Sequence, residues 1–268
     1  MLSRFTLLVL CLGLFSSFAL VPEHATPHTF ALRVMSYNIH HCNPPSEPGK
    51  IDVEAVVQTI READPDLVAL QEVDVNTGRS GNIDQAKTIA EALEMEYYFG
   101  KAIDFDGGAY GVAILSKYPI RDEMTYALPT QDDSGGEPRV LAAVRVKLPK
   151  RRNIIFASTH LSAQAADDNR LLQIRRMAEI ALLEDLPMVI AGDFNAEPGS
   201  EVINIMDSFL QRSCEDCEPT IPVNNPERAI DFIAFRPGLE FEVVSHQVIQ
   251  ETYASDHLPV LSVLQFER

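Results

Sequence analysis

The chain has 268 residues, of which 46% are hydrophobic and 23% charged, and its 39 acidic against 22 basic residues give a formal net charge of −17. These proportions are typical of a folded globular protein and exclude a disordered, collagen-like or coiled-coil chain. Non-specific binding to nucleic acid depends on cationic side chains that neutralise phosphates, so the charge also disfavours a general DNA-binding protein.

Residues 1–19 have the pattern of a secretory signal. Arg4 is the only charged residue before Glu23, and an apolar run, interrupted only by Thr6, covers 5–14. A charged start, a short apolar middle and a small-residue exit are typical of a segment that is cleaved on export. We therefore expect a signal peptide that is removed. An uncleaved membrane anchor is the alternative, although the run is shorter than the roughly 20 residues of a spanning helix.

The rest of the chain alternates short apolar runs with amphipathic segments. Apolar positions three and four residues apart predict helices over 53–63, 85–93 (capped by Asp84) and 169–183. Short apolar runs predict strands over 32–38, 67–70, 111–115, 140–148, 153–158, 188–191, 230–235, 241–248 and 259–266. Many of these strands are separated by turns rather than helices, which argues against an all-parallel sheet. We expect an α/β fold, a four-layer sandwich of two packed mixed β-sheets flanked by helices.

No repeat, low-complexity tract or linker divides this part of the chain. We expect a lead segment over 20–30 and a single domain over 31–268, monomeric, secreted or periplasmic, and without a stable membrane span after cleavage. Cys214 and Cys217 stand three residues apart, and an oxidising compartment favours a disulfide between them over two free thiols.

Polar side chains stand at the ends of six of the predicted strands. They are Asn38, Glu72, His160, Asp193 with Asn195, Asp231, and Asp256 with His257. Each of them alone has an ordinary explanation, such as a turn, a cap or a surface charge. Polar side chains at the rim of a sheet meet when their strands are neighbours. Because the feature recurs six times, we predict a functional site made from this set.

The six short segments that carry these residues resemble the endonuclease/exonuclease/phosphatase superfamily. The segments cover 35–38, 70–73, 158–161, 192–195, 230–233 and 255–260. They occur in the order of that family, whose members include deoxyribonuclease I, abasic-site endonucleases, sphingomyelinases and inositol-polyphosphate 5-phosphatases. The resemblance covers the whole expected domain and implies a metal-dependent phosphoric ester hydrolase.

The resemblance also implies a metal site. A divalent cation, Mg²⁺ with Mn²⁺ as the alternative, would be held mainly by Glu72, with Asn38 and Asp256 beside it. Hard cations of this kind prefer carboxylate and amide oxygens. Some nucleases of the family carry an acid two residues after the asparagine. This chain has His40 there, followed by His41, so we expect a single metal ion and a pocket lined by these histidines.

The remaining strand-end residues would carry out the chemistry that the resemblance implies. Asp193 would orient and deprotonate the attacking water, and Asn195 would donate to a phosphoryl oxygen. His257, kept cationic by Asp231, and His160 would bind the phosphate. The expected reaction is in-line hydrolysis without a covalent enzyme intermediate.

Three further positions complete the expected site. Arg139 begins a strand where family members often carry a phosphate-facing arginine, with a surface charge as the alternative. Arg79 follows Glu72 closely and could select an anionic substrate, or it could be a solvated loop residue. Tyr110 follows a glycine pair whose loop could reach the site, although core or rim packing is the alternative.

The substrate is the least determined feature. The acidic composition argues against a nuclease that wraps a duplex, and the basic triplet at 150–152 predicts a solvated hairpin turn. We expect a small phosphodiester or phosphomonoester, such as a small molecule or a lipid headgroup. A secreted Mg²⁺-dependent endonuclease or exonuclease is one alternative. A non-catalytic phosphate-binding module is another, but such a module would have no need to retain Asp193.

Overall fold

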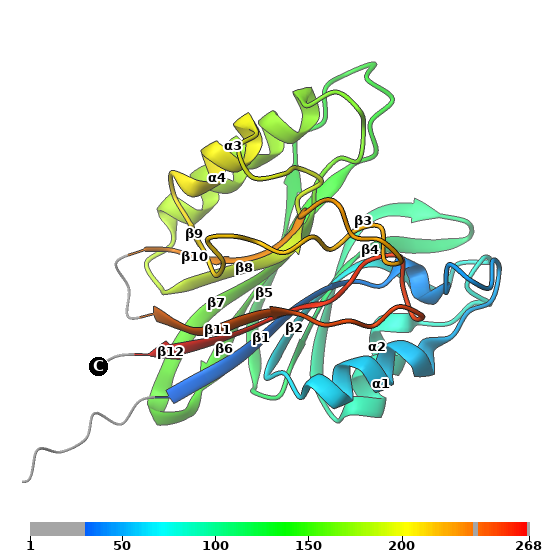
Figure 1. The fold of residues 1–268 in the computed structure, drawn as a ribbon, viewed down its shortest axis with the longest axis horizontal. Helices are drawn as coiled ribbons and strands as arrows, with labels where there is room; N and C mark the ends of the chain where they lie inside the picture. Colours follow the sequence, from blue (N-terminus) through cyan, green and yellow to red (C-terminus); the bar gives the residue numbers. More distant parts are fainter. Residues whose placement is uncertain (1–29, 238–240, 267–268) are drawn as a thin grey trace, which may run out of the picture.

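The computed structural model describes residues 30–237 and 241–266. Within these residues the chain forms two six-stranded β-sheets that pack face to face, with helices on their outer surfaces (Figure 1). This arrangement confirms the four-layer α/β sandwich. The predicted signal peptide over 1–19 lies outside the described residues, and none of the helices within them is both long and apolar enough to span a bilayer.

The first sheet combines strands from the N-terminal half of the chain with two strands from its C-terminal end. In spatial order its strands are β11 (Phe241–Val248), β12 (Val260–Phe266), β1 (Phe30–Asn38), β2 (Leu67–Val75), β4 (Gly108–Ser116) and β3 (Glu96–Phe105). β1 and β2 run parallel, and the other neighbours pair antiparallel. Helices α1 (Val53–Ala63) and α2 (Gln85–Leu93) cover its outer face (Figure 1).

The second sheet comes from the middle of the chain. In spatial order its strands are β5 (Ile120–Leu128), β6 (Arg139–Leu148), β7 (Arg152–His160), β8 (Met188–Asp193), β10 (Asp231–Phe235) and β9 (Gln211–Arg212). β7 and β8 run parallel, and the other neighbours pair antiparallel. Helices α3 (Asp168–Leu183) and α4 (Glu201–Asp207) cover its outer face (Figure 1).

Side chains alternate between the two faces of each strand, so every central strand contributes to two cores. Leu32 and Val34 of β1 point between the sheets, where they share a core with Phe156 of β7. Met35 and Tyr37 of the same strand point outward and pack under α1 and α2. Strands that are covered on both faces have continuous apolar sequences, which explains why the central strands were predictable.

The three predicted helices are confirmed to within one residue at each end. Asp52 caps α1 by accepting a hydrogen bond from the Ala55 backbone N–H at 3.1 Å. Asp84 caps α2 as expected, accepting from the Lys87 backbone N–H at 3.0 Å. A carboxylate in this position satisfies an N–H group that the first turn of a helix leaves without a partner.

All nine predicted strands are present, but the structure adds β3, β5, β9 and α4. β3 and β5 are edge strands with many exposed polar residues, so they lack the apolar run that identified the central strands. α4 and β9 are too short to give a periodic pattern. The basic triplet lies at the hairpin connection between β6 and β7 as predicted, although Arg152 already belongs to β7 and lies over the Phe266 ring.

The cysteines behave as the export hypothesis favours. Cys214 and Cys217 form a disulfide, so the alternative of two free thiols is wrong. Cys42 is a free, buried cysteine. Burial raises the pKa of its thiol, and the protonated thiol acts as a small apolar core residue.

Candidate active site

The site lies where the two parallel strand pairs end. β1 leads through α1 to β2, and β7 leads through α3 to β8, so the two sheets repeat one arrangement. The carboxyl ends of parallel strands share one edge of a sheet, and functional groups commonly gather there. Asn38 ends β1, while His160 and Asp193 end β7 and β8 as register partners. The Asn38 Nδ2 donates to Asp193 Oδ2 at 3.1 Å and thereby joins the two sheets at this edge.

Gly192 lets β8 approach β7 closely enough to make this edge. A Cβ atom at this position would lie 2.2 Å from the Thr159 carbonyl oxygen, so no larger residue fits without a backbone shift. The requirement explains the glycine directly before Asp193.

Glu72 projects from an irregularity in β2. The register between β2 and β4 shifts between Leu70 and Val73, and Glu72 has a φ of 57°, which is uncommon for a residue with a Cβ. Bulges of this kind re-aim a side chain next to functional sites. Glu72 Oε1 accepts from Asn38 Nδ2 at 3.2 Å. Burial alone would raise its pKa, but the nearby His41 and Asn38 hold the pKa well below the usual range, so Glu72 is ionised.

Asp193 is a fully buried carboxylate. Its Oδ1 accepts from the Asn195 backbone N–H at 2.8 Å, and its Oδ2 lies 3.5 Å from His160 Nε2 and 3.8 Å from His257 Nε2. Burial, and then the charge of Asp231, raise the pKa of Asp193. A carboxylate whose pKa is raised toward neutrality is suited to accept a proton from water.

His257 and Asp231 form a buried pair. His257 Nδ1 donates to Asp231 Oδ2 at 2.9 Å, and the Thr220 hydroxyl donates to the same oxygen. Burial alone would lower the pKa of His257, but the Asp231 carboxylate outweighs it and raises the pKa to about 10. The imidazole is therefore cationic at neutral pH, and its Nε2 faces Asp193. The expected Asp231–His257 pairing is present.

His160 has the opposite protonation. Burial, and then the charge of Arg139, lower its pKa well below the ordinary value, so the ring is neutral. Arg139 Nη1 lies 3.2 Å from His160 Nδ1, and a guanidinium can only donate. The ring proton is accordingly on Nε2, which points toward Asp193. Arg139 is 7% exposed and also pairs with Glu137 at 2.9 Å, so its alternative explanation as a surface charge is wrong.

Arg79 lies in an exposed turn after β2, but its guanidinium is bound by the protein. Its Nε and Nη2 donate to the two oxygens of the fully buried Asp74 at 2.7 and 2.9 Å. Its guanidinium lies over the rings of Phe105 and Tyr110, 4.4 and 5.4 Å from their centroids. Arg79 therefore keeps the exposed loop position of one alternative, while its guanidinium is ion-paired and stacked at the same time. Tyr110 is 7% exposed and packs between this pair and Arg139, at the rim of the site.

The remaining predicted residues differ in how directly they face a ligand. Asn38 Oδ1 accepts from the His40 backbone N–H at 3.1 Å while its nitrogen donates to both carboxylates. It therefore positions Glu72, and its Oδ1 keeps a second lone pair beside the proposed metal ligands. Asn195 Nδ2 donates one hydrogen to the Leu161 carbonyl at 3.1 Å, and its second amide hydrogen is left for a phosphoryl oxygen.

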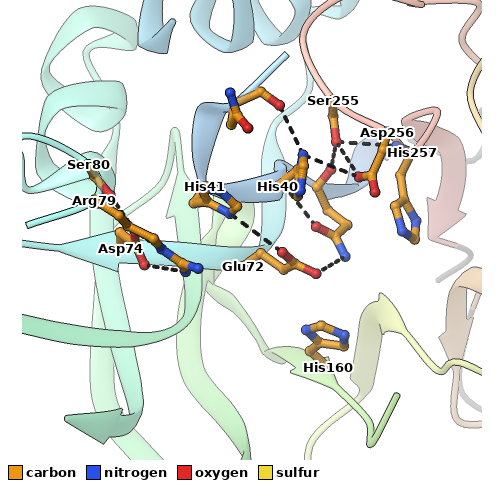
Figure 2. Close-up of polar contacts among 12 residues, drawn as sticks. His40, His41, Glu72, Asp74, Arg79, Ser80, His160, Ser255, Asp256 and His257 are labelled. Atoms are coloured by element: carbon orange, nitrogen blue, oxygen red, sulfur yellow. Dashed lines mark hydrogen bonds and ion pairs between the residues drawn. The ribbon is translucent and has the colours of Figure 1, made fainter. Parts of the chain in front are cut away.

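Asp256 and His40 complete the same edge. Asp256 Oδ1 lies 3.9 Å from His40 Nδ1, and Figure 2 shows Glu72 between the Arg79–Asp74 pair on one side and Asp256 on the other. The loop that holds Asp256 is fixed to β1 because the Ser255 hydroxyl donates to the Asn38 carbonyl at 2.7 Å.

Sequence reasoning missed three supporting residues. Asp74 anchors Arg79, Thr220 holds Asp231, and Gln85 donates from Nε2 to the His41 carbonyl at 2.6 Å. Only Asp74 carries a recognisable signal, an acid between two valines in a buried strand. The contacts of Thr220 and Gln85 join separate segments of the chain and leave no local pattern.

The fold and the sequence are both similar to those of known proteins. A sequence profile of the Endonuclease/Exonuclease/phosphatase family matches residues 35–257. The Escherichia coli (strain K12) protein YbhP, described only as uncharacterized, is 23% identical over 246 residues, which cover 86% of this chain and 95% of YbhP.

Two solved structures show the same fold. An endonuclease/exonuclease/phosphatase from Beutenbergia cavernae superposes with a TM-score of 0.76 at 26% identity, covering 88% of this chain and 72% of that one. The Bacteroides thetaiotaomicron mannosyl-6-phosphatase Bt3783 superposes with a TM-score of 0.70 at 22% identity, covering 87% and 99%. Members of the matched family are phosphoesterases that generally depend on a divalent metal. Because the match spans most of the chain and the fold agrees, this protein belongs to the endonuclease/exonuclease/phosphatase family.

Proposed function

We propose that the chain is an exported, metal-dependent hydrolase of a small or headgroup-like phosphoester. The observation that carries the proposal is the convergence of three kinds of group at one edge of the sandwich. These are an ionised carboxylate, Glu72, a buried proton acceptor, Asp193, and a cationic donor, His257. Family membership supports phosphoester hydrolysis as the reaction.

The residues present fit a hard divalent cation. Glu72 and Asp256 offer carboxylate oxygens, which Mg²⁺ prefers and Mn²⁺ also accepts. Glu72 is ionised and re-aimed toward the edge by the bulge. When bound, Mg²⁺ supplies Lewis-acid polarisation of a phosphoryl oxygen and stabilises charge on the leaving oxygen.

The chain's own residues would bind the phosphate and move the proton. Asp193 accepts the proton of the attacking water, while Asn38 and the Asn195 backbone fix its two oxygens. The cationic His257 donates from Nε2 to the phosphoryl group and stabilises its growing charge. The neutral His160 donates from Nε2 as well, in the tautomer that Arg139 imposes.

A small substrate outside the cytoplasm agrees best with the composition. The net charge of −17 disfavours a long polyanion, because nucleic-acid binding is driven by cationic side chains that displace the counterions of the phosphates. The signal-like residues 1–19 and the disulfide support export to the periplasm or the medium. The name of the similar mannosyl-6-phosphatase is in keeping with a small phosphorylated substrate.

The test is hydrolysis by the purified chain of a chromogenic phosphodiester and its phosphomonoester counterpart. We expect turnover of at least one ester that EDTA stops and Mg²⁺ restores. Plasmid DNA serves as the nucleic-acid control, and rapid nicking with steep salt dependence would favour the nuclease alternative. A folded protein that hydrolyses neither ester, no sugar phosphate, no lipid headgroup and no DNA would contradict the enzymatic proposal and favour a binding module.

A further inference from the structure

We propose that His40, His41 and Glu72 form a binding position for a transition-metal ion of the Zn²⁺ type, beside the position proposed for Mg²⁺ and sharing Glu72 with it. The inference extends the proposed metal-dependent function from one ion to two. One nitrogen from each histidine and one oxygen of Glu72 lie within 4.8 Å of one another. Ligands bind Zn²⁺ at roughly 2.0–2.2 Å, so small side-chain rotations would bring all three onto one ion.

His40 is in the tautomer that a metal ligand needs. Its Nδ1 lies 2.9 Å from the Asn43 carbonyl oxygen. A carbonyl can only accept, so Nδ1 carries the proton, and in the neutral imidazole Nε2 then has a free lone pair. Metal-binding histidines almost always donate their other ring nitrogen to a carbonyl or carboxylate in this way, because the bond fixes the ring and raises its basicity.

His41 has a buried nitrogen that the protein leaves unsatisfied. Its Nδ1 has no hydrogen-bond partner among the described residues and lies 3.8 Å from Glu72 Oε2 (Figure 2). Buried polar atoms without a partner are rare in folded proteins because they lose their water without replacement. A cation between this nitrogen and the carboxylate would satisfy both atoms.

The backbone adds an independent observation. His40, His41 and Glu72 all adopt positive φ angles of 44°, 43° and 57°, a conformation that costs free energy for residues with a Cβ. Two side chains stabilise this backbone conformation, because Gln85 donates to the His41 carbonyl and Asn38 accepts from the His40 N–H. Strained residues that neighbours hold in place cluster at ligand sites, and here every proposed ligand is strained.

The chemical types of the three ligand atoms favour one class of metal ion. Two imidazoles and one carboxylate suit Zn²⁺ and related ions, and the same set occurs in catalytic zinc sites, whereas Mg²⁺ prefers oxygen ligands. The sequence led us to expect a single metal ion, because His40 replaces an acid. The structure indicates that the replacement changes the kind of ion. The neighbouring cluster of Asp193, Asp231 and His257 is different, because His257 already pairs with Asp231 through Nδ1 and faces Asp193 through Nε2.

The test measures metal binding rather than turnover. The purified chain, with its disulfide oxidised, is titrated with Zn²⁺ by calorimetry in excess Mg²⁺, and Co²⁺ replaces Zn²⁺ for visible absorption. The variants are His40→Asn and His41→Asn, since asparagine tolerates positive φ. His246→Asn is the matched control, a histidine of β11 that contacts Ser213.

We expect one Zn²⁺ that excess Mg²⁺ does not displace. Each site variant should weaken it at least about tenfold, the loss typical of removing even an outer partner of a ligand. The control should bind like the wild type. Unchanged affinity in both site variants, or complete displacement by Mg²⁺, would overturn the inference, and circular dichroism of each variant separates lost binding from lost folding. Mg²⁺-dependent hydrolysis without Zn²⁺ binding would refute this inference alone, whereas Zn²⁺ binding without any hydrolysis would refute only the proposed function.

Discussion

Replacing Asp231 with asparagine should move the alkaline limit of activity. The amide keeps the size of the carboxylate and can still accept from His257 Nδ1, but it removes the charge that raises the pKa of His257 from 6.5 to about 10. Burial, which lowers the pKa, would remain. The charges of Asp193 and Asp256, which raise the pKa of His257, would remain as well. These opposing effects lead us to expect a pKa of His257 near its ordinary value in the variant.

The size of the effect follows from the protonated fraction. At pH 8 nearly all His257 is cationic in the wild type, whereas a pKa near 6.5 leaves about 3% cationic, an approximately 30-fold loss. At pH 6 most of the imidazole is protonated in both proteins, so the difference should nearly disappear. The assay is kcat/KM between pH 6 and 9, with Asp104→Asn, an exposed acid, as the control.

The contribution of the His257–Asp231 pair to the stability of the folded state should decrease as the pH rises. A histidine whose pKa is raised by folding stabilises the native state fully below pH 6.5, and that contribution is lost as the pH rises through about 10. The difference in melting temperature between wild type and Asp231→Asn should therefore be largest at pH 6 and shrink toward pH 10. A loss of kcat/KM by the same factor at every pH would refute the electrostatic explanation and indicate a purely geometric role for Asp231.

Three further substitutions, with Leu183→Ala as the control for the last of them, test other parts of the site and fold. Glu72→Gln should raise the Mg²⁺ concentration for half-maximal activity by at least about tenfold, because it removes a ligand charge; an unchanged Mg²⁺ titration would contradict its role. Arg139→Ala should raise KM by about 10- to 100-fold, the range for losing a charged hydrogen bond, and steady-state kinetics would show no change if Arg139 were only structural. Phe156→Ala, in the core between the sheets, should lower the free energy of unfolding by about 3–5 kcal/mol. Leu183→Ala, at a side chain that is 83% exposed, should stay within about 0.5 kcal/mol in the same denaturant titration.

The sequence predicted the central strands and long helices because burial gives them a pattern. In β6, for example, residues 140–144 are buried on both faces and form an apolar run. β3 and β5 were not predicted because many of their residues are exposed and polar, for example Arg121 and Asp122 in β5. Edge strands owe their conformation to the neighbouring strand, which a local pattern does not report.

The site residues were predictable because their strands end at one edge, but their interactions were not. Asn38 was placed correctly in the sequence, yet the direction of its amide depends on the His40 backbone and on two carboxylates from different sheets. Arg79 does lie in a turn, and its ion pair with Asp74 was not predictable because Asp74 belongs to the preceding strand. Likewise, the bulge that re-aims Glu72 arises from the pairing of β2 with β4. The sequence of β2 alone therefore does not predict it.

The central claim is that buried Asp193 accepts the proton of the attacking water. Its most direct test is kcat for Asp193→Asn on whichever phosphoester the wild type hydrolyses, with Mg²⁺ saturating and folding checked by circular dichroism. The expected result is a fall of about 100- to 10,000-fold, the range for losing a general base, with the melting transition retained. A folded Asp193→Asn protein with wild-type kcat would contradict the account.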